Sequence, residues 1–245
     1  MDIYRYFKYR AVNKNLIDSL VNSYLYFSHP SNLNDPFDCQ VDIRKSTNYA
    51  ISKVPSGLKS DIPTRISKLN GFIDEIQRRM TVIGVCSFSL TLEEPLLWAH
   101  YADEHRGICL FYEFPEDFIL DRTNEIVGVS DIEYGENPLS DWFIDIIPDQ
   151  IEDGFYDYFT TELLKRVLII KASGWNYEQE CRIIRQKAGP LSVPKEFLKQ
   201  VCFGMNVSDS DKNLISKIVD SSGYAVNYCQ IVKTECDFGI KAVTI

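Results

Sequence analysis

The run from Val82 to Ser89 places the strongest constraint on the fold. It reads Val-Ile-Gly-Val-Cys-Ser-Phe-Ser, and alternate side chains of a strand point to opposite faces of a sheet. Apolar residues therefore fall on both faces, which is typical of a strand buried on both sides. A strand of this kind is expected at the centre of a sheet.

Further strands and helices are expected along the whole chain, without regular alternation. Strands are predicted at 3–9, 25–28, 107–114, 181–184, 201–204 and 224–232, with an extended tail from Ile240. Helices are predicted at 15–23, 63–80, 93–102, 151–168 and 208–220. This order favours an α+β fold with mainly antiparallel or mixed sheets and flanking helices. No linker rich in Pro, Gly and Ser divides the chain, so residues 1–245 are expected to form one domain.

Composition limits the class of protein. The formal net charge of -9 argues against broad, non-specific binding to nucleic acid. The chain contains no run of about 18 apolar residues, the length that a membrane helix requires, so no membrane partner is expected. The seven cysteines are odd in number and show no CxxC spacing. Free thiols in a reducing, cytoplasmic setting fit this pattern better than a disulfide framework.

The segment from Trp175 to Ile184 is the first candidate site. If it is extended, Glu178, Glu180 and Arg182 share one face of a strand. A row of two carboxylates and a guanidinium beside a tryptophan is unusual at the start of a strand. A solvated face with a cross-strand ion pair is the alternative interpretation, and such pairs contribute little stability.

Two further candidates lie on predicted strands. Lys8, Tyr9 and Arg10 end the first strand, where lysine and arginine could bind phosphate or carboxylate. Ser87 and Ser89 would point to one face of the central strand. Their hydroxyl groups could orient a ligand or bond to a neighbouring strand.

The last two candidates lie on a helix and a turn. Trp98 and Tyr101 are three residues apart and share a helical face, as a ligand platform or as part of the core. Asn34 and Asp35 begin the turn Asn-Asp-Pro-Phe-Asp, which could bind a ligand or cap itself through Asx turns. His100, His105 and Cys109 match no common zinc spacing, and no metal site is predicted. Standard phosphate-binding glycine loops and the GxSxG and HExxH motifs are absent.

These segments, taken in order, resemble a known bacterial family. The set comprises Phe-Lys-Tyr-Arg, Asn-Asp-Pro-Phe-Asp, Ser-Phe-Ser, Leu-Trp-Ala-His-Tyr-Ala, Trp-Asn-Tyr-Glu-Gln-Glu-Cys-Arg-Ile-Ile and Val-Cys-Phe-Gly. It is similar to the family catalogued as domain of unknown function 2971, over about residues 4–204. The family name carries no activity.

A more distant resemblance implies a chemistry. Arginine-class ADP-ribosyltransferases carry an Arg on the first strand, Ser-x-Ser on a middle strand and Glu-x-Glu near the start of a later one, within split sheets. Arg10, Ser87-Phe88-Ser89 and Glu178-Gln179-Glu180 occur in that order here, although Phe88 stands where threonine is usual and Arg5 could equally fill the first role.

The resemblance implies NAD as substrate, in a small cytoplasmic effector of the kind that serves as a toxin or in phage defence. Glu180 would stabilise the ribosyl cation, as carboxylates do in glycoside hydrolysis. Glu178 would orient or deprotonate the acceptor, a protein or a nucleic acid. Arg10, with Lys8, would bind the pyrophosphate, and Ser87 would brace the glutamate or the ribose. Trp98 or Tyr101 could stack on nicotinamide.

Two other functions remain open on the sequence alone. One is a non-enzymatic module that binds a nucleotide or a protein through its charged strand. The other is a metal-dependent hydrolase or nuclease that uses Glu178, Asp35 and Asp38 around a divalent ion.

Overall fold

The computed structural model of the chain describes residues 2–53, 73–136, 138–146, 156–236 and 238–245. They divide into two compact units, each built from separate stretches of the chain. Unit 1 comprises Met1–Phe27, Val85–Asp131 and Asn176–Ile245, and unit 2 comprises Ser28–Gly84 and Ile132–Trp175. Because the chain passes between the units repeatedly, no linker marks a boundary. The single-domain prediction is not tested by this division and stays a prediction.

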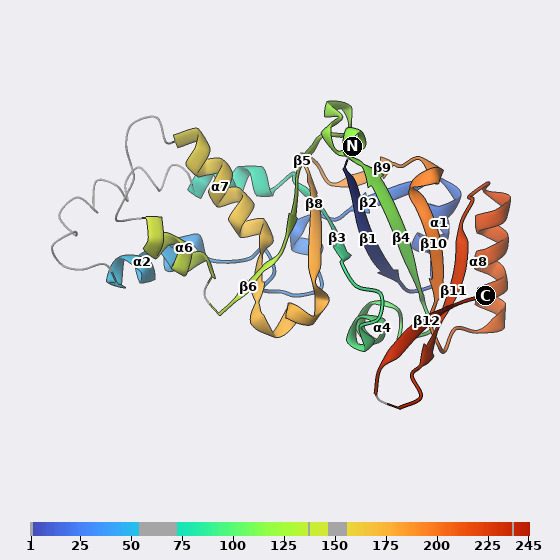
Figure 1. Cartoon of the computed structure of the whole chain (residues 1–245). Coiled ribbons are helices and arrows are strands. Elements are labelled where there is room, and N and C mark those ends of the chain that lie inside the picture. The colour runs from blue at the N-terminus through green and yellow to red at the C-terminus, as the bar shows by residue number, and fades with distance from the viewer. Residues whose placement is uncertain (1, 54–72, 137, 147–155, 237) are drawn as a thin grey trace. The chain divides into compact units, whose positions relative to one another are not determined.

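One large sheet forms the framework of unit 1 (Figure 1). Its strand order is β12-β11-β10-β4-β1-β3-β8-β5. The strands are β1 (Ile3–Arg10), β3 (Gly84–Ser89), β4 (Ile108–Pro115), β5 (Ile126–Asp131), β8 (Glu180–Arg185), β10 (Leu198–Phe203), β11 (Asn227–Lys233) and β12 (Ile240–Thr244). β10 and β11 run parallel, whereas β1 runs antiparallel to both β3 and β4. The predicted α+β class with mixed sheets is confirmed, and β3 is an interior strand as expected.

The two faces of this sheet have different covers. Tyr6, Phe88 and Phe203 lie in one core with buried residues of α1 (Lys14–Val21) and α8 (Asp209–Ser221). We call this side the α1/α8 face. β2 (Tyr24–Phe27) and β9 (Gly189–Ser192) form a two-stranded sheet that contributes to the same core.

The opposite side is the α4 face. Tyr9, Cys109 and Cys202 lie there in a second core, with Trp98 from α4 (Pro95–Tyr101). α5 (Glu116–Leu120) packs instead on the α1/α8 face, where its Ile119 belongs to the first core. Burial on both faces explains why β3 has apolar residues at successive positions.

Unit 2 has a core of its own. Ile73, Ile76, Leu139, Phe143 and Leu163 are among its buried residues. Its elements are α2 (Ile43–Lys53), the helical residues 73–80, α6 (Pro138–Ile146), α7 (Tyr156–Ile169), β6 (Glu133–Gly135) and β7 (Ile170–Ala172). β6 and β7 pair in parallel. The predicted helices 63–80 and 151–168 are confirmed where they are described, and their first residues lie outside the described part of the chain.

The cysteines are free, as predicted. Cys39, Cys86, Cys109, Cys181, Cys202 and Cys229 are buried, and Cys236 is exposed. Over the described ranges, no helix is long and apolar enough to cross a membrane.

Two glycines, Gly107 between α4 and β4 and Gly204 after β10, lie where backbones approach each other closely. Asp103, Glu104 and His105 have left-handed backbones, with φ of 48°, 52° and 67°. The turn brings the backbones so close that a Cβ on Gly107 would lie 2.3 Å from the Arg10 carbonyl oxygen. A Cβ on Gly204 would lie 2.1 Å from the His105 carbonyl oxygen. Glycine is therefore required for this close approach.

Gly204→Ala is expected to lower the free energy of unfolding by about 2 kcal/mol or more, because the obstructing atom belongs to the backbone. Gly128→Ala is the matched control, since nothing lies within 4 Å of its added Cβ. Urea unfolding of both variants measures the difference. Equal effects of the two substitutions would contradict the close approach at Gly204.

Burial lowers the pKa of His105. Its ring stacks on Trp98 with centroids 6.4 Å apart, and its Nδ1 is buried without a hydrogen-bond partner among the described residues. A histidine with a lowered pKa in the folded state stabilises the fold above its unfolded pKa of about 6.5, and this contribution is lost as the pH falls. The folded state therefore favours the neutral form of His105 over the protonated form.

Acidification from about pH 7 to pH 5 is expected to destabilise the wild type more than His105→Asn. Asparagine tolerates the left-handed backbone at this position and carries no titrating group. Unfolding free energies of both proteins across this pH range provide the measurement. Parallel curves would show that His105 does not titrate in this way.

Candidate functional site

The α4 face gathers several of the predicted polar residues of unit 1. Phe7 pairs with Ser89, so Ser87 and Ser89 share the face of Phe7 and Tyr9. On β8, Cys181 and Ile183 belong to the core of the α1/α8 face. Because side chains alternate, Glu180 and Arg182 lie on the α4 face with the two serines.

The segment from Trp175, considered from the sequence as if it were extended, is not extended at its start. The 3₁₀ helix η4 (Ser173–Glu178) occupies this stretch, and Gln179 adopts a left-handed backbone with φ 42°. Leu90 donates its backbone N–H to the Gln179 carbonyl at 3.0 Å, and Ser89 Oγ donates to the Glu178 carbonyl at 2.7 Å. These tertiary hydrogen bonds fix a bend between the two glutamates, so only Glu180 and Arg182 alternate as strand residues.

Glu178 is held by a tyrosine. The hydroxyl of Tyr101 donates a hydrogen bond to Glu178 Oε1. Glu178 is only 4% exposed, whereas Tyr101 is half-buried at the end of α4. A hydrogen bond of this kind fixes the orientation of the buried carboxylate. Tyr101 therefore orients Glu178, and its role as a stacking platform stays a prediction.

Glu180 is paired with a buried arginine. Arg182 Nε and Nη2 donate to the two carboxylate oxygens of Glu180 at 2.7 and 3.1 Å. The side chain of Arg182 is 0% exposed, and that of Glu180 is 5% exposed. This two-point contact is a strong form of ion pair, and breaking a buried pair is costly because one charge is left uncompensated. The solvated face considered from the sequence is excluded for these two residues.

The basic residues at the end of β1 are not brought together with Ser87 and Glu180. Lys8 and Arg10 alternate with Tyr9 and lie on the α1/α8 face. Lys8 Nζ donates to the Ser87 carbonyl at 2.7 Å and lies 4.9 Å from the Phe88 ring centroid. Lys8 thus links its own strand, β1, to β3.

Arg5 lies on the α4 face, with a side chain 62% exposed and an ion pair to Glu113 at 2.9 Å. Of the two first-strand arginines considered from the sequence, Arg5 is the one that shares the face of the glutamate.

Trp98 and Tyr9 are core residues. Trp98 is fully buried, its Nε1 donates to the Leu92 carbonyl at 2.8 Å, and its ring meets Tyr9 edge-on at 5.2 Å. Tyr9 donates its hydroxyl to the Thr91 carbonyl at 2.9 Å. Neither ring has a face open to a ligand, so these two residues support α4 against the sheet.

The thiol between the paired residues is not a candidate nucleophile. Burial raises the pKa of Cys181 to about 12. The thiolate is the reactive form of cysteine. Cys181 is therefore a neutral core residue at physiological pH.

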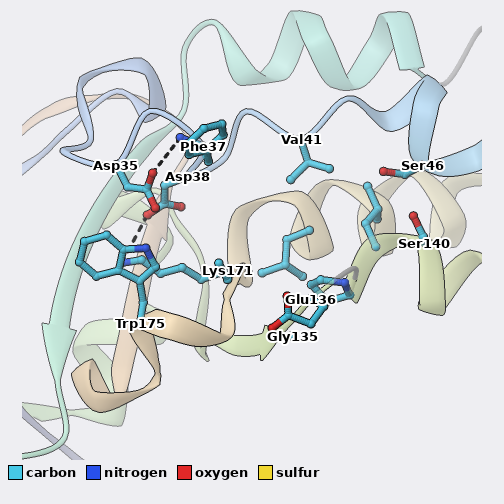
Figure 2. A pocket seen from close by; sticks show the side chains of 14 residues that line it. Asp35, Phe37, Asp38, Val41, Ser46, Gly135, Glu136, Ser140, Lys171 and Trp175 are labelled. Atoms are coloured by element: carbon cyan, nitrogen blue, oxygen red, sulfur yellow. Dashed lines mark hydrogen bonds and ion pairs between the residues drawn. The ribbon is translucent and has the colours of Figure 1, made fainter.

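Unit 2 contains a cavity of about 450 Å³ that the sequence did not predict. Figure 2 shows Asp35, Asp38, Lys171 and Trp175 together at one end of it, while Ser46 and Ser140 lie at the other. Phe37 donates its backbone N–H to Asp35 Oδ1 at 2.9 Å, which is the Asx turn considered from the sequence. Asn34, also a candidate from the sequence, is exposed and is not among the lining residues of this cavity.

Lys171 is a functional candidate that sequence reasoning missed. Its side chain is 3% exposed, and its Nζ lies 3.7 Å from Asp38 Oδ2. The sequence signal was its position directly after the apolar run Val-Leu-Ile-Ile, where a lysine becomes buried. In the part of the chain that the structure covers, no group of three or more His, Cys, Asp or Glu residues is arranged to hold a metal ion.

Arg182→Met is expected to lower the free energy of unfolding by about 3–5 kcal/mol, because the buried Glu180 charge loses this two-point contact. Glu180→Gln added to Arg182→Met should restore part of this loss. The control is Lys187→Met, which breaks the more exposed Lys187–Glu125 pair and should lower the free energy of unfolding far less. Similar losses for Arg182→Met and Lys187→Met in urea unfolding would contradict the buried pairing.

A family model described as protein of unknown function (DUF2971) matches residues 97–183. The matched stretch runs from α4 to β8 and includes Tyr101, Glu178, Glu180 and Arg182. The predicted resemblance to this family is confirmed over that stretch. No curated protein and no solved structure matches the chain. The resemblance to ADP-ribosyltransferases stays a prediction.

Proposed function

Taking the match to a family of unknown function as the starting point, we propose that this chain uses NAD as substrate and breaks the bond between nicotinamide and ribose. The observation that carries the proposal is the arrangement of the α4 face, where Glu180 and Ser87 share one side of the sheet beside Glu178 and Tyr101. Two fixed carboxylates next to hydroxyl groups suit a reaction with a ribosyl-cation transition state.

The two glutamates have different roles in the proposed reaction. The bond from ribose C1′ to the nicotinamide nitrogen breaks, and its electron pair leaves with nicotinamide. Glu180, oriented by Arg182, faces the positive charge that develops on the ribose. Glu178, oriented by Tyr101, accepts the proton of the incoming acceptor or water, whose oxygen or nitrogen forms the new bond to C1′.

The roles proposed for the other residues depend on the face of the sheet on which each residue lies. Ser87 is proposed to hydrogen-bond the ribose, and Ser89 fixes the Glu178 backbone. Arg5 replaces Arg10 as the proposed contact to the pyrophosphate, because it lies on the α4 face. The acceptor is a protein or a nucleic acid. A cytoplasmic location, with a role as a toxin or in phage defence, is part of the same proposal, and free cysteines are compatible with a reducing compartment.

One observation favours a second candidate function. The two hydrogen bonds from Arg182 compensate much of the negative charge that Glu180 would offer to a ribosyl cation. A non-enzymatic module that binds a nucleotide, with the Glu180–Arg182 pair as a structural support, is the alternative. The metal-dependent hydrolase gains no support from the described residues.

Incubation of the full chain with NAD labelled in the adenylate part, with and without cell lysate, tests the proposal through nicotinamide release and label transfer. Glu178→Gln and Glu180→Gln should each lower the rate at least about a hundredfold, the usual contribution of an acid–base or charge-stabilising group. Arg5→Ala should weaken NAD binding, whereas Arg10→Ala should leave it nearly unchanged.

Glu196→Gln, at an exposed site of the same unit, is the matched control and should retain the full rate. Circular dichroism confirms that each variant is folded. No nicotinamide release by the folded wild type would reject the enzymatic proposal. NAD binding without turnover would favour the binding module.

A further inference from the structure

The cavity of unit 2 has the size and lining of a small-molecule site. Its volume of about 450 Å³ lies within the range of about 300–1,000 Å³ that is usual for such sites. The lining residues come from the Asn34–Asp38 turn, α2, the end of β6, α6 and β7 with Trp175 (Figure 2). Apolar groups dominate the walls, including Val41, Leu139 and Ile170. A ligand could therefore bury apolar surface here.

The polar end of the cavity is negatively charged. The carboxyl groups of Asp35 and Asp38 stand against one amino group, that of Lys171, which gives this end a formal net charge of -1, and the exposed Glu136 adds a further carboxyl group to the lining. Asp35 is only 8% exposed, and the side chain of Asp38 is 2% exposed. Charge in such an enclosed place acts more strongly than charge in water. A cation is favoured over an anion.

Lys171 does not turn this end into an anion site. Its Nζ lies 3.7 Å from Asp38 Oδ2 and 5.0 Å from the centroid of the Trp175 ring. The carboxylate and the ring face both attract positive charge and already surround the ammonium. An anionic ligand would have to approach two carboxylates to reach it.

Aromatic side chains indicate the shape of the ligand. Trp175 is half-buried beside Asp35 and Asp38, and Phe37 is 80% exposed in the turn that lines the cavity. Figure 2 shows both rings at the end where the carboxylates lie. A flat cation can stack on an aromatic face while its charge meets the carboxylates.

We propose that this cavity binds a flat heteroaromatic cation, of pyridinium type, with its ring against Trp175 and its charged edge toward Asp35, since Asp38 already pairs with Lys171. The volume leaves room for a substituent on the ring, toward Ser46 and Ser140. This inference does not rest on the proposed function. Cation binding and nicotinamide release are separate measurements, and each can succeed without the other.

The probe is 1-methylnicotinamide, a flat cation, and the comparison ligand is nicotinate, an anion with the same ring. Titration calorimetry of the full chain should show binding of 1-methylnicotinamide and at least about tenfold weaker binding of nicotinate. Quenching of tryptophan fluorescence should accompany binding and should be largely lost in Trp175→Leu. This comparison in the wild type needs no variant, so it decides the charge preference even if a variant fails to fold.

The variant Asp35→Asn tests whether the cation binds in this cavity. Asparagine keeps the oxygen that accepts the Phe37 N–H but removes the charge, so affinity for 1-methylnicotinamide should fall about tenfold. Asp141→Asn is the matched control, because it removes the same charge from an exposed site of α6 outside the cavity lining. Its affinity should equal that of the wild type.

Three results would overturn the proposal. Nicotinate binding as tightly as 1-methylnicotinamide would make this an anion or neutral-ring site. No binding of 1-methylnicotinamide at millimolar concentration would show that the cavity does not take a flat cation. Equal affinities of Asp35→Asn and Asp141→Asn would place the binding elsewhere on the chain.

Discussion

The guanidinium of Arg182 has no exposed surface, and the two carboxylate oxygens of Glu180 accept hydrogen bonds from it within the large sheet. A charge in this place is tolerated only when it is compensated, since the desolvation of an isolated ion costs several kcal/mol. The pair therefore fixes the face on which β8 presents its polar side chains. That constraint also fixes Cys181 and Ile183 in the opposite core. The charged segment is thus a structural support whether or not it is also a site.

Assignment of residues to sheet faces changes the chemical interpretation of the motifs. Lys8 and Arg10 looked like partners of Ser87, yet the pairing of Phe7 with Ser89 places them on the other side. Tyr101 donates its hydroxyl to Glu178, a contact that the sequence did not predict. The bend at Gln179 gives Glu178 and Glu180 different supports, one a neutral hydroxyl group and the other a guanidinium. This difference is the reason for giving the two carboxylates different roles in the proposed reaction.

Periodicity predicted the elements with strong apolar patterns, including β1, β3, β4, α1 and α8. It missed α2, whose Arg, Lys, Ser, Thr and Asn residues leave only a weak apolar stripe. It also missed β5, where Gly128 and the polar end Ser130-Asp131 obscure the strand, and β9, which contains a proline. The polar turn at Asn34–Asp38 was visible as a motif. Its cavity was not, because Lys171 and Trp175 approach it only through tertiary contacts that one sequence does not contain.

NAD is proposed to bind on the α4 face, against Glu178 and the start of β8. Hydrogen–deuterium exchange of the full chain, with and without saturating NAD, tests this claim directly. NAD should slow exchange in peptides that contain Glu178, Gln179 and Glu180, because the exposed bend at Gln179 would be covered by the ligand. Unchanged exchange there, with protection confined to peptides of the α1/α8 face around Lys8 and Arg10, would contradict it.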